Sequence, residues 1–289
     1  MKYVSALLIT LIIASCQDSR KGVEFNSKND LSAKVKLLKP TNILSKKDNA
    51  TKVSLDKDLN IIEEAILTTA KLVYTKAFDH TIFNDLLQKH VSVRGNVNYA
   101  GFQKDKHKLN TYINQLSENT PTEEWTKPEK LAYWINAYNA LTIDLILKHP
   151  TVKSIKDIKN SWDQRLWTLG DRQFNLSDIE HEILRKMGEP RIHFAIVCAS
   201  VSCPKLQNEA FTAAHLERQL TKATKEFLAD TSKNELSKDE IKLSKIFKWF
   251  KNDFEQNGSL IDFLNRYASV KISDNAKKSY TDYNWNLND

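Results

Sequence analysis

The segment 127–148 most constrains the fold, because its helical pattern places apolar residues on nearly every side. At 100° per residue, the one clearly polar sector is formed by Asp144 and Lys148. Thr126, followed three residues later by Glu129, is typical of a capped helix start. A helix that is apolar nearly all round must be covered by the rest of its domain. We therefore expect this helix to be the central element.

Two asparagines, Asn136 and Asn139, fall among the apolar residues of this helix. A buried amide has to find hydrogen-bond partners, because leaving it unpaired away from water costs free energy. One interpretation makes both amides structural, tying neighbouring loops to the helix. The other makes them polar groups that line a pocket, and the sequence leaves both open.

The spacing of apolar residues and the turn signals predict the other elements. Helices are expected over residues 59–78, 79–90, 104–117, 177–188, 212–229, 244–254 and 259–267, and hairpins over 167–176 and 234–243. Ser177 and Glu180 have the spacing of a second capping box. The run 191–198 is apolar and β-branched, which predicts a buried strand. The expected class is α+β, a mostly helical single domain packed on a small β-sheet, with an aromatic C-terminal tail folded back on it.

The first sixteen residues have the layout of an export signal. Lys2 precedes an apolar run over residues 4–13, and small residues lead to Cys16. This layout predicts a secretory signal peptide over residues 1–15. Residues 13–16 (Ile-Ala-Ser-Cys) also resemble the lipobox of bacterial lipoproteins. The resemblance implies that Cys16 is lipidated, which places the protein in the cell envelope, anchored to a membrane with its domain on the exported side.

The positive charge of the chain is concentrated near its N-terminus. The formal net charge is +7, and Lys2 together with residues 17–58 accounts for +5 of it. Residues 17–58 are rich in Lys, Asn, Ser and Asp without a sustained period, so residues 16–58 are predicted to be a lipidated end and disordered linker. The nearly neutral remainder predicts no nucleic-acid partner. The expected partner is membrane lipid, through Cys16, and the sequence identifies no protein or small-molecule partner.

Two cysteines, Cys198 and Cys203, remain once Cys16 is assigned to lipid. An even number of cysteines in an exported chain favours a disulfide. The alternative is a reactive thiol, with His181 or His193 as its base. In a strand, His193 and Cys198 would face opposite ways, so His193 would reach Cys203 more easily.

Other chemistry receives less support from the sequence. Glu180, beside His181, is either part of the capping box or an orienting carboxylate in a site. The Cys-x4-Cys spacing is not one that zinc sites use, so no metal is expected. The chain has six glycines and no phosphate-binding glycine loop, and it lacks Gly-x-Ser-x-Gly and His-Glu-x-x-His motifs. No cofactor is therefore expected.

Several ordered blocks of the chain resemble the family called domain of unknown function 547. The blocks are 133–143, 178–181 (Asp-Ile-Glu-His), 191–204, 243–249 and 283–289. In the last block, Asn284 stands where the family commonly has Asp. The resemblance implies that residues 78–289 form one domain and that residues 59–77 are an N-terminal helical extension. Its bacterial members are often exported or lipid-anchored, and its name leaves the activity open.

Two classes of function follow. The favoured one is a binding or accessory module of the envelope, with the two cysteines joined. The alternative is a thiol-dependent hydrolase or acyl transferase. It would use Cys198 or Cys203 as nucleophile and His181 or His193 as base, with the orienting group drawn from Glu180, Asn136 and Asn139.

Overall fold

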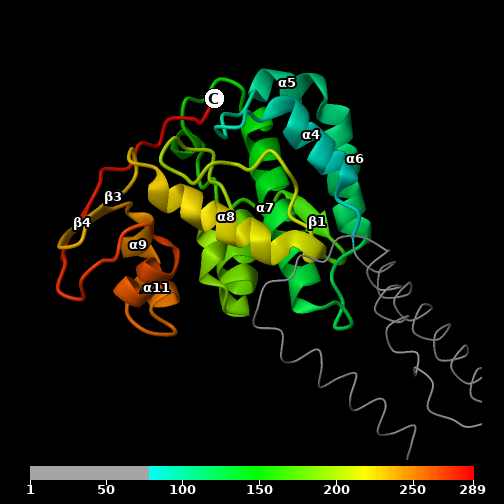
Figure 1. The fold of residues 1–289 in the computed structure, drawn as a ribbon. Coiled ribbons are helices and arrows are strands. Elements are labelled where there is room, and N and C mark those ends of the chain that lie inside the picture. The colour runs from blue at the N-terminus through cyan, green and yellow to red at the C-terminus, as the bar shows by residue number, and fades with distance from the viewer. Residues whose placement is uncertain (1–77) are drawn as a thin grey trace, which may run out of the picture. The chain divides into compact units, whose positions relative to one another are not determined.

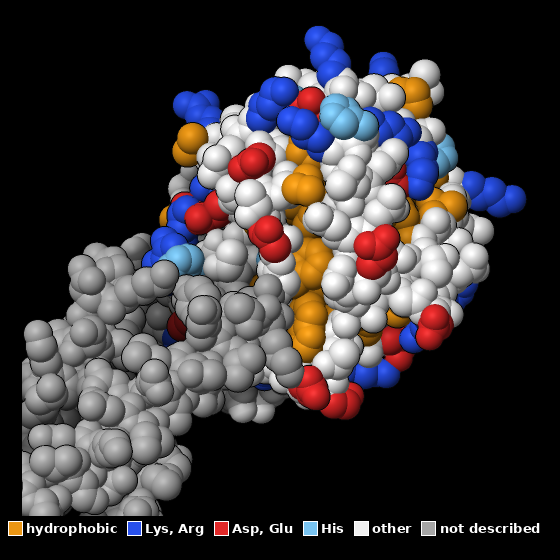
Figure 2. Space-filling model, turned by 90° about the vertical axis from the view of Figure 1, so that its right-hand side faces the viewer, with side chains coloured by type: hydrophobic (Ala, Val, Ile, Leu, Met, Phe, Trp, Pro, Cys, Tyr) orange, Lys and Arg blue, Asp and Glu red, His pale blue; other side chains and the backbone are white. Residues whose placement is uncertain are grey.

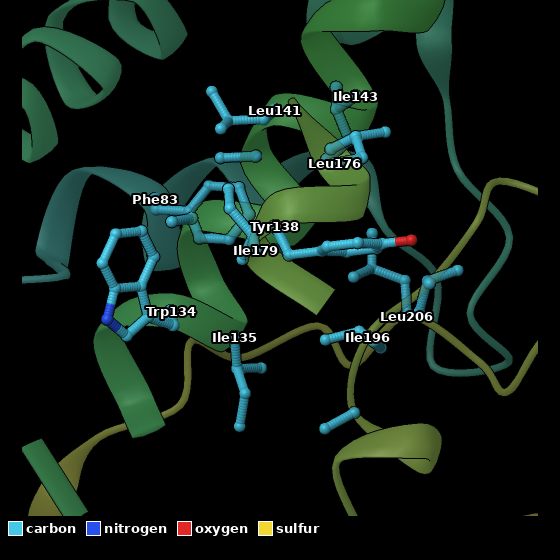
Figure 3. Packing of buried hydrophobic residues seen from close by; sticks show 14 of the residues in the cluster. Phe83, Trp134, Ile135, Tyr138, Leu141, Ile143, Leu176, Ile179, Ile196 and Leu206 are labelled. Atoms are coloured by element: carbon cyan, nitrogen blue, oxygen red, sulfur yellow. The ribbon is translucent and has the colours of Figure 1, made fainter. Parts of the chain in front are cut away.

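Helix α7 (Lys127–Lys148) is surrounded by other elements of the domain, as its sequence predicts (Figure 1). Every residue from Leu131 to Leu147 is buried. In the predicted polar sector Lys148 is exposed, whereas Asp144 is buried, accepts a hydrogen bond from the indole of Trp167 at 2.7 Å and pairs with Lys148. Figure 3 shows side chains of α7 pointing in several directions into the surrounding apolar residues. The helix therefore serves as the scaffold around which the domain packs.

The computed structural model describes residues 78–289. The predicted signal peptide, Cys16, the linker and the helical extension over residues 59–77 lie outside the described residues. The described helices are α4 (Thr81–His90), α5 (Tyr99–Lys104), α6 (Lys106–Glu118), α7, η1 (Ile155–Asp157), η2 (Asp178–Leu184), η3 (Arg185–Met187), η4 (Pro190–Phe194), η5 (Ala213–His215), α8 (Leu216–Ala229), α9 (Ile246–Trp249), α10 (Lys251–Phe254) and α11 (Leu260–Tyr267). The described strands are β1 (Trp167–Leu169), β2 (Arg172–Phe174), β3 (Glu235–Leu236), β4 (Glu240–Leu243) and β5 (Lys277–Tyr280).

The strands form two small sheets, and the helices dominate, so the α+β class is confirmed. β1 and β2 make the predicted hairpin, with Gly170 at a positive φ of 59° in its turn. β3 and β4 make the second predicted hairpin, and β5 joins β4 in parallel. The large apolar cluster lies around α7. A smaller cluster lies among α8, α9, α10 and α11, on the side of the domain that carries the three-stranded sheet (Figure 1).

The predicted strand over residues 191–198 is wrong. The chain there forms the short 3-10 helix η4, started by Pro190 and by Glu189, whose side chain accepts from the backbone N–H of Arg191. The chain then continues as irregular backbone. There the carbonyl of Ala195 and the N–H of Val197 bond to the side chain of Asn139 on α7 rather than to a neighbouring strand. An apolar run is compatible with any fully buried conformation, and periodicity alone does not distinguish them. Because no strand forms here, strand alternation does not determine the directions in which His193 and Cys198 point.

Two local predictions also need correction. Ser177 and Glu180 do not form a capping box, because Asn175 and Asp178 exchange the reciprocal bonds instead. The hydroxyl of Ser177 bonds Asp163. The following helix η2 has π-type geometry, and the helical stretch ends at Gly188 as predicted.

The helix predicted over 244–254 is divided into α9 and α10 at Phe250. The one predicted over 259–267 is present as α11, with a capping box formed by Ser259 and Asp262. The C-terminal tail folds back as expected, since Leu287 pairs with Ser200 in an isolated bridge. The tail's last residues lie near α5, close to the end marked C in Figure 1.

The outer face on the side of α4 and α6 is mixed in character. Figure 2 shows a narrow stripe of hydrophobic side chains there, bordered by polar and charged groups. Within residues 78–289, no helix combines the length and apolarity needed to cross a membrane.

Candidate functional site

The loop that follows η4 contains a disulfide between Cys198 and Cys203, as the cysteine count predicts. The two Cα atoms are 6.3 Å apart. Between them, Ala199 has a φ of 59°, in the left-handed region that residues with a Cβ seldom occupy. Cys203 is 3% exposed, whereas Cys198 is half-buried. The loop is thus a tight, locally strained turn with one half-buried cysteine and one buried cysteine.

Polar groups surround the buried sulfur. The backbone N–H of Cys198 donates to the Cys203 Sγ at 3.1 Å. The hydroxyls of Ser200 and Tyr283 lie 3.3 Å and 3.2 Å from the same atom. The Tyr283 hydroxyl is also 3.4 Å from the Cys198 Sγ, and 3.2 Å from the hydroxyl of Ser200.

The C-terminal tail places Tyr283 beside the disulfide. The backbone N–H groups of Val201 and Ser202 donate to the carbonyl oxygens of Asn286 and Asn284, at 2.8 Å and 3.2 Å. The N–H of Asn284 in turn donates to the Ser202 hydroxyl at 2.8 Å. The tail therefore runs along the disulfide loop. It brings Tyr283, which lies 80 positions after Cys203 and 85 after Cys198, into contact with both sulfurs.

Glu180 projects from η2 into the same region. It is 7% exposed, and the hydroxyl of Tyr138 on α7 donates to its Oε2 at 2.9 Å. Complete burial, with the charge of Glu180 adding to it, raises the pKa of Tyr138 far above the usual value. Burial also raises the pKa of Tyr283 to about 12, and the charge of Glu180 contributes. Glu180 is thus bound by Tyr138, and its charge acts on Tyr283, the residue that contacts the disulfide.

The two predicted histidines contact other groups. The Nε2 of His193 lies 2.8 Å from the Oδ2 of Asp253, and its ring stacks on Phe250 with centroids 3.9 Å apart. His181 is exposed, and its Nδ1 lies 3.4 Å from a guanidinium nitrogen of Arg185. Among the described residues, no hydrogen bond joins either histidine to either sulfur.

Arg185 and His193 share Asp253 as their anion. The guanidinium of Arg185 makes two bonds to the carboxylate, at 2.6 Å and 2.9 Å. Burial alone would raise the pKa of Asp253, but the hydrogen bonds from His193 and Arg185, and their charges, hold it well below the usual range. Asp253 belongs to α10, Arg185 to η3 and His193 to η4, so these interactions hold the three elements together.

Asn136 and Asn139 tie two segments to α7. The amide of Asn136 donates to the carbonyl of Phe211 at 2.7 Å and accepts from its N–H at 3.0 Å. The amide of Asn139 donates to the carbonyl of Ala195 at 2.9 Å and accepts from the N–H of Val197 at 2.9 Å. Asn139 therefore fixes the backbone immediately before Cys198.

Aromatic rings cover the outside of the site. We define the aromatic cluster as Trp162, Trp249, Tyr283 and Trp285. Trp249 is 45% exposed and packs against Tyr283 and Trp285, with ring centroids 4.8 Å and 5.8 Å apart. Trp285 also meets Trp162 at 5.9 Å, and the ammonium of Lys156 lies 4.3 Å from its ring. Trp249 is thus the exposed member of a cluster whose other three rings are half-buried next to the disulfide.

The sequence reasoning singled out Cys198, Cys203 and Glu180 but missed their nearest partners. Tyr138 falls within the apolar pattern of the central helix, and Tyr283 falls within the aromatic C-terminal tail, so neither pattern assigns the residue a role in a site. Ser200 stood inside a resembling block without a role. Asp253 gave no signal, because its partner His193 is sixty positions away. Within residues 78–289, no group of three or more His, Cys, Asp or Glu side chains has the arrangement to hold a metal ion.

Comparison with known proteins gives one result. A family model described as "Protein of unknown function, DUF547" matches residues 122–228. The matched segment includes α7, Glu180 and both cysteines, whereas Asp253 and Tyr283 lie outside it. No curated protein and no solved structure matches the chain significantly.

Proposed function

We propose that this chain is an exported lipoprotein, cleaved before Cys16 and held in the cell envelope by lipid on that cysteine. The layout of residues 1–16 supports the export signal and the lipid site. The disulfide agrees with export, because disulfides persist in oxidising compartments and are rare in the cytosol. The folded domain lies on the exported side, joined through residues 17–58 to the membrane lipid.

Replacing the proposed lipid site should release the protein from the membrane. We expect Cys16→Ser to move the protein from the membrane fraction to the soluble fraction, because each buried CH₂ of an acyl chain contributes about 0.8 kcal/mol to membrane binding. The measurement is fractionation of the producing bacterium, with Ser19→Ala as the matched control. Membrane retention of a Cys16→Ser protein that has lost residues 1–15, equal to that of the control, would exclude the lipid anchor.

We propose that the folded domain is a binding or accessory module rather than a thiol-dependent hydrolase or acyl transferase. The Cys198–Cys203 disulfide carries this proposal, since an oxidised pair offers no thiolate for nucleophilic attack. The aromatic cluster supplies a surface of the kind that binding sites use, because exposed Trp and Tyr side chains are enriched where binding energy is concentrated. Trp249 is its most exposed described member.

A thiol-dependent hydrolase or acyl transferase is the second candidate, and it requires the reduced protein. The observation in its favour is that Tyr283 contacts both sulfurs, and that the charge of Glu180 acts on this tyrosine. The observation against it is the engagement of His193 by Asp253, which leaves no hydrogen-bonded base on either sulfur among the described residues.

Thiol titration of the purified Cys16→Ser protein, unfolded without reductant, separates the two candidates. The binding module predicts no reactive thiol, because both remaining cysteines are joined. Two reactive thiols would overturn the proposed function and favour the cysteine enzyme. Repeating the titration after reduction provides the control, since both thiols must then appear.

A further inference from the structure

The two sulfurs of the disulfide differ in exposure. Cys198 is half-buried, whereas Cys203 is 3% exposed. The hydroxyls of Ser200 and Tyr283 lie 3.3 Å and 3.2 Å from the Sγ of Cys203, and each lies 3.4 Å from the Sγ of Cys198. Thiol–disulfide exchange begins when a thiolate attacks one sulfur, and the other sulfur leaves. Access therefore directs attack to the Sγ of Cys198 and makes Cys203 the leaving thiolate.

The leaving sulfur has three donors arranged around it. The backbone N–H of Cys198 points at the Sγ of Cys203, and the hydroxyls of Ser200 and Tyr283 lie within 3.3 Å of it. Both hydroxyl hydrogens can rotate toward that atom once it carries a negative charge. Hydrogen bonds to the charged form stabilise it, which lowers the pKa of a thiol and makes it a better leaving group.

Tyr283 remains a donor throughout the neutral range. Burial raises its pKa to about 12, so its hydroxyl keeps its proton at any pH where exchange would occur. The carboxylate that contributes to this shift, Glu180, already accepts the hydroxyl of Tyr138. The phenol is also held in place, because its ring packs against Trp249 and Trp285.

We propose that the Cys198–Cys203 disulfide is a thiol–disulfide exchange centre whose substrates are thiols, an activity beyond the proposed binding function. A substrate thiolate attacks the Sγ of Cys198, so that a substrate–Cys198 mixed disulfide forms and the Cys198–Cys203 bond breaks. The electron pair of that bond goes to Cys203, which leaves as a thiolate bound by the three donors. A second substrate thiolate then attacks the substrate sulfur, giving an oxidised substrate and a reduced cysteine pair.

The rate of reduction of the Cys16→Ser protein tests the proposed donors. The probes are glutathione and an unstructured peptide with one cysteine. A faster reaction with the peptide identifies protein thiols as the substrates, and a faster reaction with glutathione identifies small thiols. With either probe, the disulfide of Tyr283→Phe should react roughly three- to tenfold more slowly than that of the parent protein. The variant lacks one charge-assisted hydrogen bond to the leaving thiolate, and the exchange rate depends on only part of the stability of that thiolate. Tyr280→Phe is the matched control and should react like the parent protein.

The ionisation of Cys203 provides a readout that a merely structural role would not change. In the reduced Cys198→Ser protein, thiolate absorbance should titrate below the usual Cys value of about 8.5. Adding Tyr283→Phe should raise that pKa. An unperturbed pKa, or equal reduction rates for Tyr283→Phe and Tyr280→Phe, would overturn the proposal.

Trapping of the mixed disulfide tests the direction of attack. With oxidised glutathione as the probe, the Cys198 thiolate of Cys203→Ser should attack it, form a glutathione adduct and release a glutathione thiolate, whereas Cys198→Ser should form its adduct on Cys203 much more slowly. Equal or reversed rates would overturn the assignment of Cys198 as the attacked sulfur. These measurements start from a cysteine pair set to a known redox state. Their outcome is therefore independent of the titration that tests the binding module.

Discussion

Asn139→Leu should lower the free energy of unfolding by about 3 to 5 kcal/mol. The substitution keeps the branched shape of the side chain but removes both hydrogen bonds of the amide. The carbonyl of Ala195 and the N–H of Val197 would then be buried without those partners, and each such group costs about 1–3 kcal/mol. Overpacking by leucine in a fully buried helix adds to the loss.

Urea unfolding followed by circular dichroism measures this effect, and the melting temperature should fall by roughly 10 °C for a domain of this size. Asn114→Leu is the matched control, because Asn114 lies on the exposed side of α6 and should change stability by at most about 0.5 kcal/mol. A small loss at Asn139, comparable to the control, would show that the backbone before Cys198 does not depend on this amide.

The central helix could be predicted because every level of the sequence agreed. Its capping signal, apolar periodicity and length all indicate a buried helix over 127–148, and α7 has those bounds. The hairpins were predictable for the same reason, since turn residues separate short alternating runs. These features depend on residues that are neighbours in sequence.

The segment around Cys198 could not be predicted, because its conformation depends on distant residues. Residues 191–198 have the composition of a strand, but the amide of Asn139 takes up the backbone groups that a sheet would otherwise bind. The composition of this segment predicts correctly that it is buried, but it predicts the wrong backbone conformation.

The site shows the same division. The pairing of Cys198 with Cys203 was predicted from the even number of cysteines that remains when Cys16 is set aside. The roles of Tyr283 and Asp253 depend on contacts across eighty and sixty positions, for which a single sequence carries no local signal. The neighbouring positions of Glu180 and His181 suggested a shared role, yet one side chain is buried and the other exposed.

Asp253→Asn should lower the free energy of unfolding by about 2 to 4 kcal/mol at neutral pH. The variant keeps the size of the side chain but leaves the guanidinium of Arg185 without the anion that it contacts through two bonds. His193 also loses its charged partner. Removing one member of a buried ion pair costs about 3–5 kcal/mol, and the partial exposure of Arg185 reduces that figure here.

The pH dependence identifies the cause of this loss. Because the folded protein holds the pKa of Asp253 well below its usual value, the carboxylate stabilises the fold at any pH above that usual value, about 3.9. Its contribution is lost as the pH falls below about 4, toward the pKa in the folded state. The stability difference between the parent protein and Asp253→Asn should therefore be constant from pH 7 to about pH 5 and shrink toward pH 2. Urea unfolding at four pH values measures it, with the exposed Asp274→Asn as the control. A difference that stays constant down to pH 2 would mean that the loss comes from altered packing rather than from the lost charge.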